Sequence, residues 1–115
     1  MERVADKRDI RRIKKRITIN FSDDKVVKVG FTQDISMVGM FIHSPYVLPP
    51  NSKIKIKMML EGSTVEVMAI VMWSKKIPPN LFHLVKKSGM GVRFLHFNSG
   101  EEAFDEYFDK IATPL

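Results

Sequence analysis

The sequence predicts an all-β protein, a six-stranded antiparallel barrel with a flexible N-terminal arm and a C-terminal helix. Six short segments show the alternation or the β-branched enrichment of strands, with turn-forming residues between them. Helical periodicity with start and stop signals is confined to the last part of the chain. Closing the six strands into a barrel would remove the exposed sheet edges that invite pairing with other chains.

The six expected strands are separated by short polar, glycine-containing or proline-containing connections. They span about residues 17–22, 25–32, 40–43, 53–58, 64–73 and 89–95. Residues 34–39 are expected to form a tight connection, and the basic segment 74–88 a connecting loop.

Two of these segments predict which faces are buried. In residues 53–58, lysine alternates strictly with apolar residues, which predicts one wet face on an edge-like strand. Residues 68–73 are apolar at consecutive positions, which predicts a central strand buried on both faces.

The C-terminal helix is expected over about residues 99–112. Ser99 is a candidate N-cap, and Glu102 three residues later would complete a capping box. Apolar residues from Phe104 to Ile111 recur on one helical face, and Pro114 lies beyond the expected end.

The formal charge of +6 divides the chain into two regions. Residues 1–16 contain eight basic and three acidic side chains, or +5, and the rest contains eleven and ten, or +1. We therefore expect residues 1–16 to be a basic arm and residues 17–115 to be the barrel with its helix. Such an arm seeks phosphate, nucleic acid or an anionic surface, or only aids solubility. The spacing of Ile10, Ile13 and Ile17 allows a helical turn, and residues 1–11 are expected to be mobile in the free protein.

Several classes of function find no support in the sequence. The absence of cysteine excludes disulfides and thiolate metal sites, and the three scattered histidines predict no metal site. No apolar run approaches the ~20 residues of a membrane span, and no secretory signal follows the basic start, so cytoplasm is the default location. No nucleophile elbow or phosphate-binding loop is present, and nothing places His43 between Asp34 and Ser36 as a triad. We expect no enzymatic activity.

Two groups of residues suggest ligand binding. Arg8, Arg12 and Arg16 are spaced by four, and arginine can bond phosphate, or O6 and N7 of guanine, through two donors at once. The second group is the motif Asp34-x-Ser36-x-x-Gly39.

The second motif has a structural and a functional interpretation. Asp and Ser bond nearby amides in turns, and glycine takes conformations closed to other residues. Alternatively, Asp34 could accept hydrogens from guanine N1 and N2, Ser36 could add a contact, and Gly39 could leave room for a base or phosphate.

Together, the two motifs resemble those of the PilZ family of cyclic-diguanylate receptors. Arg12 and Arg16 match the family's R-x-x-x-R motif directly before the first strand, and Asp34, Ser36 and Gly39 match its [D/N]-x-S-x-x-G turn. Residues 89–94 also resemble the family's last strand.

The resemblance implies a stand-alone, non-catalytic receptor for the bacterial second messenger cyclic diguanylate. The implied ligand-binding residues are Arg11, Arg12, Arg16, Asp34, Ser36 and Gly39, with Arg8, Trp73 and Gly91 as possible secondary contacts. Arg11, directly before the first motif, implies that two ligand molecules bind together. No other cofactor and no metal are implied. The ligand would order the arm onto the barrel and so change a surface that an unidentified effector protein recognises. The processes that the resemblance implies are motility, exopolysaccharide synthesis and surface attachment in biofilms.

Two other functions remain open from the residues alone. One is a general nucleic-acid binder using the arm with Lys53, Lys55 and Lys57, although these lysines lack the interleaved aromatic residues that stack on bases. The other is a protein-interaction module that binds no nucleotide.

Overall fold

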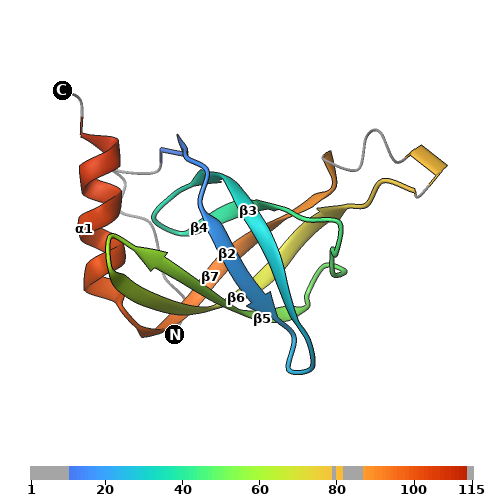
Figure 1. Ribbon diagram of the computed structural model, residues 1–115, viewed down its shortest axis with the longest axis horizontal. Helices are drawn as coiled ribbons and strands as arrows, with labels where there is room; N and C mark the ends of the chain where they lie inside the picture. Colours follow the sequence, from blue (N-terminus) through green and yellow to red (C-terminus); the bar gives the residue numbers. More distant parts are fainter. Residues whose placement is uncertain (1–10, 79, 82–86, 114–115) are drawn as a thin grey trace.

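The computed structural model describes residues 11–78, 80–81 and 87–113. They form a seven-stranded sheet and one helix (Figure 1). The elements are β1 (Ile13–Lys14), β2 (Thr18–Ser22), β3 (Val27–Ile35), β4 (Gly39–His43), β5 (Lys53–Leu60), β6 (Ser63–Lys75), β7 (Gly89–Ser99) and α1 (Glu101–Ala112).

Six of the strands form the closed antiparallel barrel that the sequence predicts. Their order is β3-β2-β5-β6-β7-β4, and pairing between β3 and β4 joins the two ends. The two-residue strand β1 adds to β3 outside this ring. β5 pairs with both β2 and β6, so the expectation of an edge-like strand was wrong, because barrel closure gives it a neighbour on each side.

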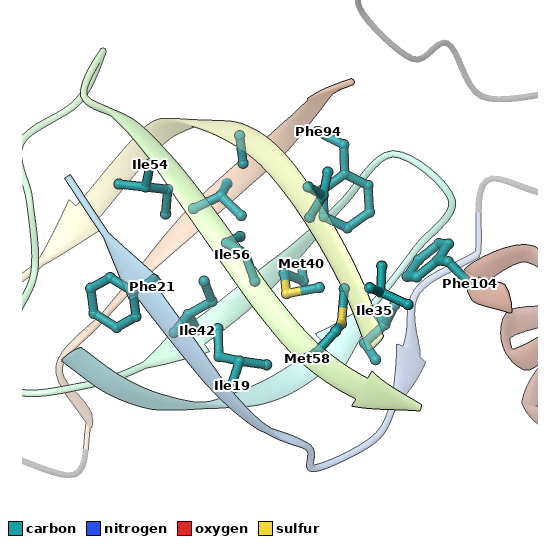
Figure 2. Packing of buried hydrophobic residues seen from close by; sticks show 14 of the residues in the cluster. Ile19, Phe21, Ile35, Met40, Ile42, Ile54, Ile56, Met58, Phe94 and Phe104 are labelled. Atoms are coloured by element: carbon teal, nitrogen blue, oxygen red, sulfur yellow. The ribbon is translucent and has the colours of Figure 1, made fainter. Parts of the chain in front are cut away.

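The barrel interior is filled by the apolar face of each strand. In β5, Ile54, Ile56, Met58 and Leu60 point inward, while the intervening lysines are exposed, as the alternation predicts. Figure 2 shows Ile54, Ile56 and Met58 in the barrel interior together with Phe21 of β2 and Ile42 of β4.

At the C-terminal end of β6, only one face of the strand is buried. Val67, Ala69 and Val71 are fully buried, but Met72 and Trp73 are 47% and 51% exposed. The prediction that residues 68–73 are buried on both faces was therefore wrong at this end. The register between β6 and β7 shifts between Val71 and Trp73, and no described element covers the outer face of the barrel here completely.

Helix α1 lies against one end of the barrel, beside the β5–β6 hairpin (Figure 1). Phe104 and Phe108 are buried, as the helical periodicity predicts. The predicted capping box of Ser99 and Glu102 was wrong: Ser99 is still paired in β7, and the N-cap is Gly100, with φ 79°. The extended strand needs an abrupt turn before the helix, and only glycine adopts this left-handed backbone without strain. Pro114 lies outside the described residues. None of the helices that the structure describes is long and apolar enough to cross a membrane.

The described part of the arm is extended, so the helical turn that the spacing allows does not form between Ile13 and Ile17, and Ile10 lies outside the described residues. Ile13 and Lys14 pair with Ile35 and Asp34 of β3, because β3 offers unpaired backbone groups beyond the end of β2. The buried Thr32 hydroxyl anchors the segment that follows. It donates to the Lys15 carbonyl at 2.6 Å and accepts from the Ile17 amide at 2.8 Å. Residues 1–10, which carry most of the expected mobile segment, lie outside the described residues.

Candidate ligand-binding site

The turn between β3 and β4 is built by the Ser36 hydroxyl. This oxygen accepts hydrogen bonds from the amides of Val38 and Gly39 at 3.2 and 3.1 Å and donates to the Gly39 carbonyl at 3.2 Å. Ser36 is only 2% exposed. In the structure, Ser36 therefore holds the turn through backbone contacts. A direct contact between Ser36 and a ligand stays a prediction.

Gly39 lies where β4 crosses close to β7. A Cβ atom at this position would be 2.2 Å from the Val92 carbonyl oxygen, so a larger residue would push the two strands apart. The adjacent Val38 carbonyl accepts from the Phe94 amide at 2.7 Å. Gly39 thus allows the close strand contact that holds the turn, and with it the end of β3, in place.

A β-bulge in β3 places two consecutive side chains on the outer face of the barrel. Thr32 pairs with Ile42 and Asp34 with Phe41, so Gln33 is an extra residue without a partner in β4. Thr32 is buried inside, whereas Gln33 and Asp34 both face outward. The expected tight connection therefore begins later than predicted, because Asp34 still belongs to β3.

Arg12 and Asp34 bring the two sequence motifs together. Arg12 Nε donates to Asp34 Oδ1 at 3.0 Å, and Arg12 Nη2 lies 2.7 Å from the same oxygen. The contact follows from the pairing of β1 with β3, in which Lys14 lies opposite Asp34. The side chains are 51% and 18% exposed, so both remain accessible to a ligand.

Arg16 lies at a cleft on the outer face of β3 and β4, with a volume of about 650 Å³. Its guanidinium carbon stands 4.2 Å from the centre of the Phe31 ring. Such cation–π packing orients the planar donors of arginine. Gln33 and His43 line the same cleft, whose size is typical of small-molecule sites.

A second cleft of about 500 Å³ contains Arg12 and Asp34 and shares Gln33 and His43 with the first. Trp73 stacks on Phe41 at one side of it, with ring centroids 5.0 Å apart and planes inclined by 20°.

Gly91 lies beneath the Trp73 indole. A Cβ atom there would be 2.3 Å from Trp73 Nε1, so the absent side chain makes room for the ring. Trp73 and Gly91, two of the three possible secondary residues, thus lie at one aromatic surface, and whether that surface contacts a ligand stays a prediction.

The charge of the two clefts favours an anionic ligand. The described cations that line them are Arg12, Arg16, Lys75 and Lys87, and the described anion is Asp34. Neither Lys75 nor Lys87 is among the ligand-binding residues predicted from the sequence, although both belong to the basic segment 74–88. Gln33 is not among them either, because its outward position depends on a bulge that the sequence pattern does not reveal.

The structure does not place Arg11 in either cleft. Its Nη1 donates to the Ala112 carbonyl near the end of α1 at 3.2 Å. Arg8 lies outside the described residues. In the part of the chain that the structure describes, no cluster of three or more His, Cys, Asp or Glu side chains could hold a metal ion.

Comparison with known proteins finds a matching family model and similar solved structures. A family model described as PilZ domain matches residues 6–108. The inhibitor of motility MotI/DgrA of Bacillus subtilis superposes with a TM-score of 0.67 at 14% identity, covering 96% of this chain and 53% of that one. This chain thus spans about half the length of MotI/DgrA.

A second similar structure is the PilZ domain of CeSA from a cellulose-synthesizing bacterium. It superposes with a TM-score of 0.56 at 18% identity, covering 88% of this chain and 94% of that one. At these identities the two structures support the fold. No curated protein matches the chain in sequence.

Proposed function

Because the chain belongs to the PilZ domain family, we propose that it is a non-catalytic receptor for cyclic diguanylate. The proposal depends mainly on one observation: Arg16 lines the first cleft and Arg12 and Asp34 line the second. The two clefts share Gln33 and His43. Residues from both sequence motifs thus line two neighbouring clefts.

The proposed contacts to phosphate come from the arginines. Each guanidinium offers parallel N–H donors that match two phosphate oxygens, and Arg16 is already oriented by Phe31. A ligand with two phosphodiester groups carries two negative charges, which the excess of cations around the clefts would attract.

The proposed contact to guanine comes from Asp34. In the free protein this carboxylate is occupied by Arg12. Guanine N1–H and N2–H could replace Arg12 as donors, and the released guanidinium could turn to a phosphate. An ion pair this exposed contributes only about 0–1 kcal/mol, so the exchange would require little energy.

We propose that signalling proceeds through the arm. Residues Ile13 to Ile17 already contact β3, so the ligand would act on an arm whose C-terminal end is attached to the barrel. Ligand contacts would order the arm on the outer face and change a surface that an effector protein recognises. A cytoplasmic location and a role in motility are parts of the same proposal; the name of MotI/DgrA supports the second.

Isothermal titration calorimetry with cyclic diguanylate tests this function. We expect saturable heat for the wild type and binding at least about 10-fold weaker in Arg12→Ala and in Arg16→Ala, because a charged hydrogen bond contributes ~1.5–3 kcal/mol. Lys53→Ala removes an exposed cation of β5 that lines neither cleft and serves as control.

Two outcomes would contradict the proposal. Absence of heat with the wild type would exclude the receptor function, and unchanged affinity in both arginine variants would exclude a binding site at Arg12 and Arg16. Micromolar binding of a random oligonucleotide with a steep salt dependence would instead favour the general nucleic-acid binder.

A further inference from the structure

We propose that Gln33 and His43 are a specificity pair, in which His43 holds the Gln33 carboxamide so that it offers donors to guanine and rejects adenine. This inference rests on the proposed function, and it names two residues outside both sequence motifs. His43 lies on β4 and Gln33 on β3, and each lines both clefts.

The bulge explains why Gln33 can serve as a selecting residue. As the extra residue of β3, it has no partner in β4. Its side chain is exposed, next to the outward-facing Asp34. Bulges commonly redirect a side chain beside a functional site. Gln33 and Asp34 thus present an amide and a carboxylate from consecutive positions.

His43 fixes which end of the amide faces the ligand. Its Nε2 lies 2.6 Å from Gln33 Oε1, and the ring donates to this oxygen in the tautomer that carries its proton on Nε2, which we assign to His43 because this is the shorter of its two ring-nitrogen contacts. The ring packs perpendicular to the ring of Phe41, with centroids 4.9 Å apart. Its Nδ1 carries no proton in this tautomer, so it lies 3.4 Å from the Ser88 carbonyl oxygen without donating to it. Within the described residues, the Gln33 amide nitrogen has no hydrogen-bond partner, which leaves its two N–H groups for a ligand.

This orientation of the Gln33 amide distinguishes guanine from adenine, because the two purines present different hydrogen-bonding groups. Guanine presents two acceptors, O6 and N7, whereas adenine presents the acceptor N7 beside the donor N6–H. An unrestrained glutamine can satisfy adenine with its carbonyl and amide together. With its carbonyl engaged by His43, Gln33 offers only donors, so adenine N6–H would face another donor. Discrimination by an unpaired polar group of this kind is on the order of 10- to 100-fold.

The pair is poorly explained as a device for stability. Its hydrogen bond is exposed, and the two strands are already joined through Phe31 and His43, Thr32 and Ile42, and later pairs. Exposed polar contacts contribute little to folding, so substitutions here should leave the barrel intact.

Calorimetric titration with cyclic diguanylate and with cyclic di-adenylate tests the pair. We expect the wild type to prefer cyclic diguanylate. His43→Phe keeps an aromatic ring against Phe41 but frees the Gln33 carbonyl, so the preference should fall by about 10-fold, mainly through tighter binding of the adenine ligand. Gln33→Glu replaces the donors with a carboxylate and should weaken cyclic diguanylate binding by about 10-fold or more.

Gln33→Ala and the control Lys53→Ala complete the series, and circular dichroism verifies that each variant is folded. The alanine variant should lose preference, and the control should keep it. Binding of cyclic diguanylate with an unchanged preference in both His43→Phe and Gln33→Ala would overturn the specificity pair alone. A wild type that binds neither ligand would overturn the receptor function together with this inference.

Discussion

Arg12 and Asp34, which are 22 positions apart in the sequence, form an ion pair at the junction of β1 and β3, with a closest separation of 2.7 Å. This contact joins the arginine motif of the arm to the turn motif of the barrel. Both residues line the second cleft, so the contact lies where a ligand would have to replace it.

The first prediction concerns Asp34→Asn. The variant keeps an oxygen acceptor but loses the charge that favours guanine N–H donors, so affinity for cyclic diguanylate should fall by about 10-fold. The melting temperature should change little, because an exposed ion pair contributes ~0–1 kcal/mol. Calorimetry and thermal unfolding measure the two effects separately.

Glu66→Gln provides the matched control for Asp34→Asn. Glu66 also pairs with a cation, Lys57, at 3.7 Å, but lines neither cleft. Its substitution should leave affinity unchanged. Equal affinities of Asp34→Asn and the wild type for cyclic diguanylate would show that the Asp34 charge does not contribute to binding.

The second prediction separates the two interpretations of Ser36. In Ser36→Ala the amides of Val38 and Gly39 lose their acceptor, so the barrel should be destabilised by about 1–3 kcal/mol. Denaturant unfolding measures this loss. Ser63→Ala, at an exposed position of β6, should leave stability nearly unchanged. Full stability of Ser36→Ala together with lost ligand binding would favour direct contact over a structural role.

The third prediction uses Trp73, the single tryptophan of the chain. Its exposed indole lines the second cleft, so its fluorescence should change when cyclic diguanylate binds. In Gly91→Ala the added methyl group would meet Trp73 Nε1, so the ring must shift. We expect altered fluorescence of the free variant and ligand affinity weakened several-fold.

Trp73→Phe tests the same surface without crowding the backbone. The smaller ring can still stack on Phe41, so this variant should bind more tightly than Gly91→Ala. A ligand that binds the wild type without changing its fluorescence would place the bound molecule away from the indole.

The fourth prediction concerns Arg11 and ligand stoichiometry. We expect the wild type to bind two molecules of cyclic diguanylate and Arg11→Ala to bind one, as the family resemblance implies. In the free protein Arg11 donates to the Ala112 carbonyl, so binding a second molecule would require this bond to break. Calorimetric stoichiometry, checked by analytical ultracentrifugation, decides between one and two. An identical stoichiometry in both proteins would assign Arg11 to the helix end instead.

Much of the barrel could be predicted from the sequence, because local patterns carry the information. The lysine alternation of β5 predicts its two faces, since a strand must present alternate residues to water and to the core. The start of α1 could not be predicted in the same way. Ser99 has the chemistry of an N-cap, yet its pairing with Glu66 extends β7 and transfers the cap to Gly100.

The arginine and turn motifs were likewise visible in the sequence, but their geometry was not. The resemblance to the PilZ family implies that Arg12 and Asp34 belong to one site, and the pairing of β1 with β3 accounts for their contact. The resemblance also implies that Arg11, directly before the first motif, binds ligand, although in an extended segment neighbouring side chains point in opposite directions. The structure places Arg11 at the end of α1 instead.

The class of fold, the excess charge of the arm and the residue types suited to phosphate and guanine could all be predicted from the amino-acid sequence. Which of these side chains share a surface depends on the folded arrangement. It follows from the bulge at Gln33, a single residue without a partner in β4, which reverses the alternation of β3 and turns Gln33 and Asp34 outward together. A one-residue irregularity leaves the local hydrophobic pattern nearly unchanged, yet it sets the face on which the following side chains lie.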